Sequence, residues 1–462
     1  MVLARLLGPA DYGVFAVALV VQQIGRALVE LGLPVPMVQR EEPPTLHEQR
    51  AITGMVLLAG TGVAILTWVV ALGLLPAVGV RSEVVRAAAV SCVAIPIFGL
   101  RLVPMVAVER SLAFGRLIAV EVSETIAFYA FAIPCAALDF GPYSLAGAVP
   151  ASALVGAGVA FVVRPWSFGL GFDLRVVKPM ARFGIAVSAL HPIHLVRELS
   201  ILTAASLAGG QGLAGFYSFA QRLFALHTAF MVAIQRVGLP ILSRMPRGPD
   251  RDTRAASACS VAAVAAGFIM AVVAGTADPL IHVLFGPRWA PAGEVVLAAA
   301  PGMLMAASAG AVASSLALAN RDGRTPLVAA AVSAACGAIV AAALCPGLGA
   351  TGAGLASAAS LLLGGWVLLR GQVETSRRSA LTAIAISIVL TLMAAGAARH
   401  LTHGQDVVAI GQAMAIAACV WWAGAALLLR REVRLGWTVM RRTFPRGFSA
   451  LGSNQPRNPE GR

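Results

Sequence analysis

The sequence contains few charged residues. Asp, Glu, Lys and Arg make up only 12% of its 462 residues, 58% are hydrophobic, and the mean hydropathy is +0.83. A water-soluble domain carries about 25% charged residues. The composition therefore excludes a soluble globular protein and indicates a chain that folds inside a membrane.

Segments of alternating polarity are also lacking. The hydrophobic residues form continuous runs of about 20 residues, which is the length that a helix needs to cross a hydrocarbon core roughly 30 Å thick. Because lipid offers no hydrogen bonds to the backbone, only helices and closed barrels can span it, and barrel strands alternate in polarity. The sequence predicts an all-α polytopic membrane protein.

Motifs for metal and nucleotide binding are missing. The six cysteines form no CxxC pair, and we interpret them as small packing residues. His400 and His403 lack a third ligand, which favours a solvated turn. No GxxxxGK[ST] loop occurs, which argues against ATP hydrolysis. We predict no metal and no cofactor.

Apolar windows predict thirteen membrane-crossing helices. They lie near residues 12–33, 51–76, 87–107, 117–138, 143–163, 183–206, 213–238, 257–278, 292–318, 325–345, 350–370, 380–398 and 407–429.

The net charge of +14 is distributed as a topology signal. Lys178 is the only lysine, and most arginines lie in loops beside the spans. When the loops are numbered alternately, most basic residues fall on one side, which indicates that this side and the C-terminus are cytoplasmic. The pattern does not indicate a nucleic-acid partner. The opposite side has Arg5, Arg81, Arg86, Arg288 and Arg399.

An odd number of spans with a cytoplasmic C-terminus places the N-terminus outside, although no signal peptide precedes it. The opening MVLARLL is similar to the last turns of an earlier helix. We therefore expect that the natural chain begins upstream of Met1 or that this sequence is truncated.

Two stretches in each half of the chain are similar. GPADYGVFAVA (8–18) is similar to GGQGLAGFYSFA (209–220), and LGLPV (31–35) to VGLPI (237–241). A repeat of about 200 residues is the layout that transporters use to build a site between two bundles. The alternative is chance, because Gly, Ala and Phe are common in membrane helices.

We predict five segments on this basis. The list is an N-terminal bundle at 1–163 with its first helix largely missing, an amphipathic cytoplasmic linker at 164–182, a C-terminal bundle at 183–370, an extra helix pair at 371–430, and a basic, disordered cytoplasmic tail at 431–462. The linker is open to two interpretations, a hinge between the bundles or a membrane anchor.

Several motifs resemble one family. LARLLGPADYGVFAVAL, ELGLPVPMVQR, GFYSFAQRL, RVGLPILSRM and LIHVLFGPRWAPA are similar to the Wzx-type polysaccharide flippases of the MOP superfamily. The resemblance implies 12 or 14 helices in two six-helix bundles, with any extra pair at the C-terminus. It also implies that helices 1, 2, 7 and 8 line a central cavity.

The resemblance further implies a function. We expect a non-enzymatic flippase that moves an undecaprenyl-pyrophosphate-linked oligosaccharide across the bacterial inner membrane by alternating access. The lipid-linked oligosaccharide and membrane lipid are then the expected partners, and a polysaccharide polymerase and chain-length proteins are candidate protein partners.

Some charged residues fall well inside the spans. A charge at the bilayer centre costs about 2.5–3.5 kcal/mol on insertion scales, so each needs a partner or a wet cavity. With the first helix restored, these residues lie on helices 2, 7 and 8, which the resemblance assigns to the cavity. They are Arg26, Glu30, His191, His194, Arg197, Glu198 and Arg222.

We hypothesise two roles for these residues. Guanidinium groups bind phosphate oxygens bidentately and stay charged when desolvated. The substrate-binding candidates are therefore Arg26, Arg197 and Arg222. The supporting or proton-coupling candidates are Glu30, His191, His194 and Glu198, with Gln22, Gln23 and Gln221 as further partners for sugar hydroxyls.

The alternative is that these charges form internal salt bridges that hold the bundles together. Arg26 and Glu30 share the i, i+4 spacing that allows such a pair. Arg222 has no acidic residue three or four positions away, which makes it the strongest functional candidate. Glu121 and Glu124 lie on a helix outside the expected cavity, which favours a structural role for them.

Two other functions compete with the flippase. A drug/cation antiporter of the same superfamily would need acidic residues lining its cavity, whereas the candidates here are rich in arginine. A membrane glycosyltransferase or ligase would need catalytic carboxylates on a sizeable loop outside the membrane. The expected loops are too short for that.

Overall fold

The computed structural model describes most of the chain. The described residues are 2–30, 37, 45–69, 73, 81–111, 113–163, 171–173, 175, 176, 178, 190–320, 322–370, 374–402, 404 and 406–435. Within these ranges the regular structure is entirely helical. The all-α membrane fold predicted from the apolar runs is confirmed.

The first half of the chain forms one group of helices, which we call the N-lobe. Its elements are α1 (Val2–Leu6), α2 (Pro9–Glu30), α4 (Leu46–Val69), α5 (Ser82–Cys92), α6 (Ala94–Arg110), α7 (Phe114–Ala137) and α8 (Pro142–Val163). α5 and α6 follow one another across Val93 and together provide one candidate span.

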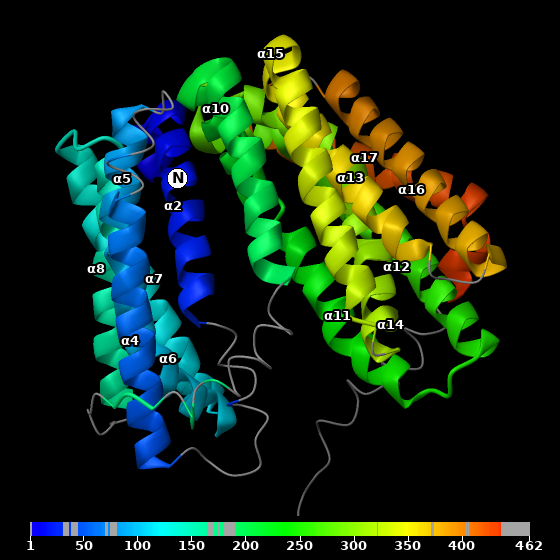
Figure 1. Ribbon diagram of the computed structural model, residues 1–462. Coiled ribbons are helices and arrows are strands. Elements are labelled where there is room, and N and C mark those ends of the chain that lie inside the picture. The colour runs from blue at the N-terminus through cyan, green and yellow to red at the C-terminus, as the bar shows by residue number, and fades with distance from the viewer. Residues whose placement is uncertain are drawn as a thin grey trace, which may run out of the picture.

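The second half forms the C-lobe, which stands beside the N-lobe in Figure 1. Its helices are α10 (Leu190–Leu223), α11 (Ala225–Arg244), α12 (Pro249–Phe285), α13 (Pro291–Met305), α14 (Ala311–Ala319), α15 (Arg324–Leu369), α16 (Glu374–Leu401) and α17 (Val407–Leu428). A short 3₁₀ helix (Pro287–Trp289) precedes α13, and a π-helical segment (Ala306–Gly310) separates α13 from α14.

Helix α10 is a hairpin rather than one rod. Gly209 and Gly210 leave the helical region, with φ of −126° and 72°. The Tyr217 hydroxyl donates a hydrogen bond of 3.2 Å to Glu198, although these residues are 19 positions apart. On a straight helix they would be about 28 Å apart, so the chain reverses direction at the two glycines. α11 continues the second arm.

Helix α15 also turns back on itself. Its 46 residues would extend about 69 Å if straight, about twice a membrane's hydrocarbon core. Gly349 has a φ of 54°, which favours glycine, and a Cβ on Gly364 would lie 3.1 Å from the Ser333 Cβ. The two arms therefore pack antiparallel.

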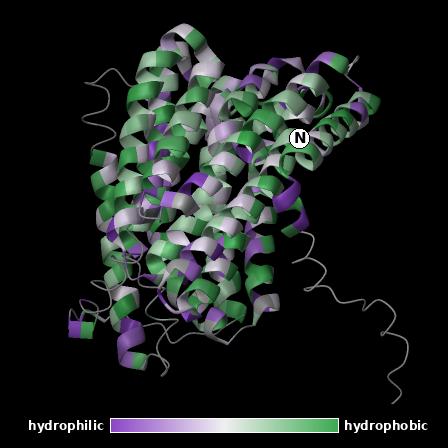
Figure 2. Ribbon diagram, turned by 90° about the vertical axis from the view of Figure 1, so that its right-hand side faces the viewer, coloured by the Kyte–Doolittle hydropathy of each residue, from purple (hydrophilic) through white to green (hydrophobic). Residues whose placement is uncertain are grey.

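The number of crossings follows from these turns. The described residues contain 12 helices that are long and apolar enough to cross a membrane. Because α15 crosses twice, thirteen crossings result, and each overlaps one of the predicted windows. Many large apolar side chains on the outer helix faces are exposed, and Figure 2 shows hydrophobic residues along the length of these helices. Such faces suit contact with lipid.

Successive crossings alternate in direction, so the arginines near the helix ends can be assigned to one end of the molecule or the other. Helix ends such as Arg244 in α11 and Arg378 in α16 lie at one end of the molecule, whereas Arg5, Arg288 and Arg399 lie at the other. We call these the basic end and the opposite end. The assignment of the basic end to the cytoplasm stays a prediction.

One loop carboxylate at the basic end fixes the start of α15. Asp322 accepts hydrogen bonds from the Thr325 hydroxyl at 2.5 Å and from the Arg324 and Thr325 amides at 3.0 and 3.1 Å. The bonds from Thr325, followed by that from the Arg324 amide, hold the pKa of Asp322 below its usual value. A charged carboxylate before the first turn also interacts favourably with the helix dipole.

The lobes meet where α2 packs against α10. A Cβ on Gly13 would overlap the Gln211 carbonyl oxygen, and one on Gly215 would overlap the Pro9 carbonyl oxygen. The two backbones can approach this closely because both positions are glycine. We call this contact the α2–α10 crossing.

Further contacts at the opposite end join the lobes. The buried Trp289 donates its indole N–H to the Ala4 carbonyl at 3.0 Å, and its ring is perpendicular to the Tyr12 ring at 5.1 Å between centroids. Arg288 donates a hydrogen bond of 2.8 Å to the Arg5 carbonyl. The predicted motif around GPRW thus joins the C-lobe to the start of the N-lobe.

Some predicted features lie outside the described residues. Among them are residues 31–35 of the second repeat motif, the end of the predicted span 51–76, most of the linker at 164–182, residues 183–189 of the C-terminal bundle, His403 and residues 436–462 of the tail. In the described part of the linker, the Gly171 amide donates a 3.0 Å hydrogen bond to the Arg50 carbonyl, and His47 pairs with Asp173 at 3.1 Å. This part therefore lies against the first turns of α4.

Candidate functional site

A cavity of about 560 Å³ is lined by residues of both lobes, and we call it the inter-lobe cavity. α2 contributes half of its lining residues, α6, α7 and α8 contribute mainly aromatic and apolar groups, and α10 contributes from the C-lobe. Its strongly polar lining residues are Gln22, Gln23, Arg26, Glu30, His191 and Arg222. Four of the predicted site residues therefore meet in one cavity.

Arg26 lies on the face of α2 that lines this cavity. Its Nε donates to Glu30 Oε1 at 2.6 Å, because residues four apart on a helix share a face. The guanidinium also lies 4.4 Å from the centroid of the Phe98 ring, a cation–π contact. The side chains of Arg26 and Glu30 are 36% and 27% exposed, so the pair is accessible from the cavity.

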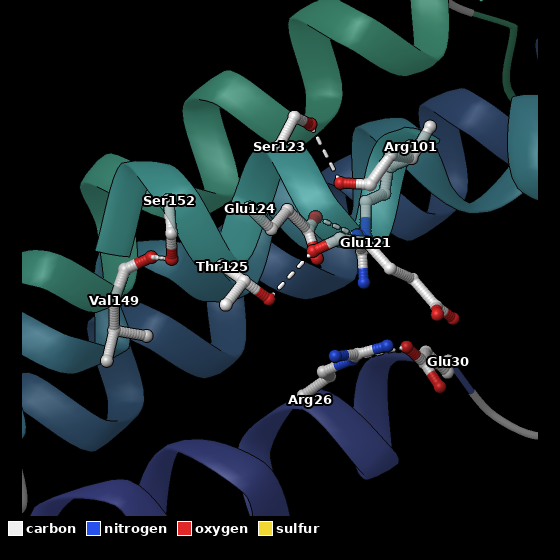
Figure 3. Close-up of polar contacts among 10 residues, drawn as sticks. Arg26, Glu30, Arg101, Glu121, Ser123, Glu124, Thr125, Val149 and Ser152 are labelled. Atoms are coloured by element: carbon white, nitrogen blue, oxygen red, sulfur yellow. Dashed lines mark hydrogen bonds and ion pairs between the residues drawn. The ribbon is translucent and has the colours of Figure 1, made fainter. Parts of the chain in front are cut away.

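A second ion pair lies close to the first but does not line the cavity. Arg101 on α6 pairs with Glu124 on α7, and their side chains are only 12% and 20% exposed. Figure 3 shows this pair next to Arg26 and Glu30. A Cβ on Gly156 would overlap the Glu124 side chain, so glycine in α8 makes room for it. Arg101 also contacts the Phe98 ring, with its guanidinium 4.9 Å from the ring centroid.

The ion pair between Arg101 and Glu124 was not predicted from the sequence. The position of Arg101 inside the predicted span 87–107 was the available signal, because an arginine within a span needs a partner. Glu124, which was expected to be structural, provides that partner.

Arg222 is the least neutralised cation of the inter-lobe cavity. Its guanidinium carbon lies 5.1 Å from the centroid of the Tyr12 ring. No carboxylate among the described residues forms an ion pair with it. The charge of Arg222 thus faces a cavity in which the Arg26 charge is already balanced by Glu30.

A second cavity, of about 480 Å³, lies inside the C-lobe, and we call it the C-lobe cavity. Helices α10, α11, α13, α14 and α15 and the π-helical segment line it. Two predicted site residues, His194 and Arg197, belong to this cavity rather than to the inter-lobe cavity. The stripe of charged and polar residues on α10 is therefore divided between two cavities.

Arg197 is held by contacts within the C-lobe. It donates 3.3 Å and 3.5 Å hydrogen bonds to the Ser360 hydroxyl and to Glu198. Glu198 also accepts the Tyr217 hydroxyl and lines neither of the two cavities. This arrangement resembles the internal salt bridge that the sequence left open as an alternative, although Arg197 still reaches the C-lobe cavity.

The described residues contain no group of three or more His, Cys, Asp or Glu side chains placed to hold a metal ion. Both cavities instead present arginine, histidine, amide and hydroxyl groups. This chemistry suits phosphate and hydroxyl-rich ligands, which hydrogen-bond such groups.

Two helical lobes that enclose a polar cavity between them define a membrane transporter. The polysaccharide biosynthesis protein family matches residues 2–294, which is more than half of the chain. The chain belongs to this family, and the family predicted from the GPADYG and FGPRW motifs is confirmed.

One relative is the succinoglycan biosynthesis transport protein ExoT of Rhizobium meliloti (strain 1021). It is 27% identical over 316 residues, which cover 66% of this chain and 62% of the relative. The matched part therefore spans less than two thirds of the relative's length.

Two solved structures share the fold. The lipid II flippase MurJ in an inward closed conformation superposes with a TM-score of 0.72 at 12% identity, over 94% of this chain and 95% of MurJ. An inward-facing multidrug resistance MATE family transporter of the MOP superfamily gives a TM-score of 0.52 at 13% identity, over 87% and 94% of the two chains. At this identity the likeness shows the fold alone, and these proteins are transporters rather than enzymes.

Proposed function

We propose that this protein is a flippase that translocates an undecaprenyl-pyrophosphate-linked oligosaccharide across the bacterial inner membrane. The observation that carries the proposal is Arg222, an arginine without a carboxylate partner among the described residues, in a cavity between two lobes. A diphosphate group is a dianion or more, and guanidinium binds its oxygens in a planar, bidentate fashion.

The remaining predicted residues have supporting roles in this proposal. Arg26 offers a second guanidinium at the same cavity, and Glu30 orients it through their ion pair. His191 and the glutamines of α2 can hydrogen-bond the group that joins the diphosphate to the first sugar. Family membership supports the link to polysaccharide biosynthesis.

We propose alternating access as the mechanism, with the basic end in the cytoplasm. The contacts between the lobes include the α2–α10 crossing and the Trp289 contacts at the opposite end. A cavity bounded by both lobes can open to one side or the other when the lobes rotate about such a contact. The predicted polymerase and chain-length partners stay predictions.

The inter-lobe cavity gives less support to a drug/cation antiporter. An organic cation would need a free carboxylate, and Glu30 is paired with Arg26 at 2.6 Å. Of the two glutamates next to Arg101 in Figure 3, Glu124 is paired with Arg101, and Glu121 is not among the residues that line the cavity.

A translocation assay in proteoliposomes tests the proposal. Undecaprenyl diphosphate carrying a labelled hexose is incorporated, and the exposed glycan is measured by oxidation with membrane-impermeant periodate. We expect Arg222→Gln to slow translocation by about 10- to 100-fold, because a hydrogen bond to a charged group contributes about 1.5–3 kcal/mol. Arg222→Lys should retain more activity than Arg222→Gln.

Arg236→Gln is the matched control, because Arg236 is exposed on α11 and lines neither cavity. The same charge change there should leave the rate unaltered. Equal rates for wild type and a well-folded Arg222→Gln variant would reject the role of the inter-lobe cavity.

A further inference from the structure

The two cavities share a wall. α10 contributes His191 and Arg222 to the inter-lobe cavity and His194 and Gln221 to the C-lobe cavity. His191 and His194 are one helical turn apart, and Gln221 precedes Arg222 directly. Each arm of the α10 hairpin therefore carries polar side chains of both cavities, so that a ligand with two chemically different parts could be bound on both sides of α10.

The C-lobe cavity contains buried polar atoms without hydrogen-bond partners among the described residues. They are Arg197 Nε, Gln221 Nε2, His227 Nδ1 and Ser333 Oγ. Buried polar groups in proteins are nearly always paired, and leaving them unpaired is costly. All four residues line the C-lobe cavity, so a small rotation of each side chain would bring its unpaired atom into contact with a polar ligand there.

The four atoms offer both kinds of hydrogen bond. Arg197 Nε and Gln221 Nε2 are donors, and the Ser333 hydroxyl both donates and accepts. His227 is fully buried, and its Nε2 donates to the Met303 carbonyl at 2.6 Å. In the neutral ring Nδ1 is then the acceptor. This mixture matches hydroxyl groups, each of which donates and accepts.

The charge balance and the apolar residues of the C-lobe cavity further restrict the chemical class of ligand that it can bind. Arg197 is balanced by Glu198, so the cavity lacks the uncompensated cation that a diphosphate needs. Met231, Met303 and Leu361 supply apolar contacts between the polar groups. A sugar ring has C–H faces and hydroxyl edges and fits such a surface, whereas a polyprenyl chain would leave the polar atoms unpaired. The volume lies within the roughly 300–1,000 Å³ usual for ligand pockets.

We propose that the C-lobe cavity is a glycan subsite that binds uncharged, hydroxyl-bearing sugar rings of the substrate while the diphosphate lies in the inter-lobe cavity. This inference rests on the proposed function and extends it, because it assigns recognition of the sugar to Gln221, His227 and Ser333. Arg222 then provides affinity for the diphosphate of any such lipid, and the C-lobe cavity provides selectivity among glycans.

Binding to the full chain in lipid nanodiscs tests the subsite. The probes are undecaprenyl diphosphate and the same lipid carrying a hexose or an N-acetylhexosamine, and the readout is the ratio of glycosylated-lipid to bare-lipid affinity. We expect wild type to bind at least one glycosylated probe about tenfold more tightly than the bare lipid, as a few additional hydrogen bonds allow. Gln221→Leu combined with Ser333→Ala should bring the ratio close to one.

A second variant fills the cavity without removing an unpaired polar atom. Among the described residues the Ser314 hydroxyl bonds only to the Ala311 carbonyl of its own helix, so Ser314→Leu adds volume from α14 and should also bring the ratio close to one. Arg236→Gln should leave both affinities unaltered, and Arg222→Gln should lower both by the same factor. Thermal unfolding of each variant shows that it is folded.

The outcomes separate the two proposals. A ratio that stays near tenfold in both cavity variants, or a wild-type ratio of one for every probe, overturns the glycan subsite and leaves the role of Arg222 intact. If wild type binds neither the bare nor the glycosylated lipid, the proposed function itself fails, and the subsite fails with it.

Discussion

Three arginines in the N-terminal crossings and α10 have different partners, and the differences explain their roles. Arg26 shares its charge with Glu30 at the cavity surface, Arg101 is buried against Glu124, and Arg222 meets an aromatic ring instead of a carboxylate. A buried pair stabilises the lobe only while both partners are present. An unbalanced cation at a cavity wall is free to bind an anion.

The sequence predicted the local part of this pattern and missed the distant part. The i, i+4 spacing predicted that Arg26 and Glu30 could pair, and the absence of nearby acids predicted that Arg222 would lack a partner on its own helix. Arg101 and Glu124 are 23 positions apart on two helices, and spacing within one helix says nothing about such a contact.

The Arg101–Glu124 pair leads to a prediction about stability. Arg101→Leu leaves a largely buried carboxylate without its partner, which should destabilise the protein by about 3–5 kcal/mol. Arg101→Leu combined with Glu124→Leu removes both charges and should recover most of that loss. Unfolding of the purified chain in mixed micelles measures both values.

Single and double variants together form a thermodynamic cycle, which isolates the interaction between the two side chains. Additive losses in the double variant would contradict the pair. They would show that each residue stabilises the lobe through other contacts.

At the scale of the helix, glycine determines where the chain reverses and where the lobes touch. The windows predicted from hydropathy match all thirteen crossings because a run of apolar residues is itself the requirement for crossing a membrane. Their ends were less predictable. The reversals in α10 and α15 lie at Gly210 and Gly349, whose torsion angles are non-helical, and both glycines fall in gaps between predicted windows, although the windows did not predict where each helix ends.

The α2–α10 crossing depends on the absence of a side chain at Gly13. Gly13→Val would place methyl groups against the Gln211 carbonyl, and backbone atoms cannot move aside as a flexible side chain could. We expect a loss of about 1–3 kcal/mol, which is typical of overpacking, and a lower melting temperature of the purified protein.

Gly62→Val is the matched control for this substitution. Gly62 also lies in a membrane-crossing helix, α4, but a Cβ there meets nothing within 4 Å. Gly62→Val should change the free energy of unfolding by no more than about 0.5 kcal/mol, as a surface substitution does. Its melting temperature should therefore stay close to that of wild type. Equal melting temperatures for the two valine variants would show that the lobes do not need the close approach.

At the scale of the whole molecule, the predicted repeat and the observed contact between the lobes agree in one respect. Gly13 and Gly215 occupy equivalent positions in the two similar motifs, and each lies against the helix that carries the other. Equivalent residues of two related halves can meet only near the axis that relates them. The crossing would then lie near that axis, where a rotation of the lobes moves atoms least, although the repeat itself stays a prediction.

Tying the lobes together at the opposite end should stop a mechanism that needs them to rotate. On a background without the six native cysteines, Arg5→Cys and Arg288→Cys place two thiols where Arg288 now reaches the Arg5 carbonyl at 2.8 Å. A cleavable bismaleimide that links the two cysteines should reduce translocation of the glycosylated lipid to below roughly a tenth of its rate, because the covalent link keeps the two lobes from separating at this end. Cleavage of the spacer should restore the rate.

Glu294→Cys with Thr351→Cys is the matched control pair within the C-lobe, where the two side chains are 2.9 Å apart, and linking these cysteines should leave translocation unaltered. Rapid translocation by a fully linked Arg5–Arg288 pair would mean that the substrate passes without the lobes separating at this end, and alternating access would have to be abandoned for this protein.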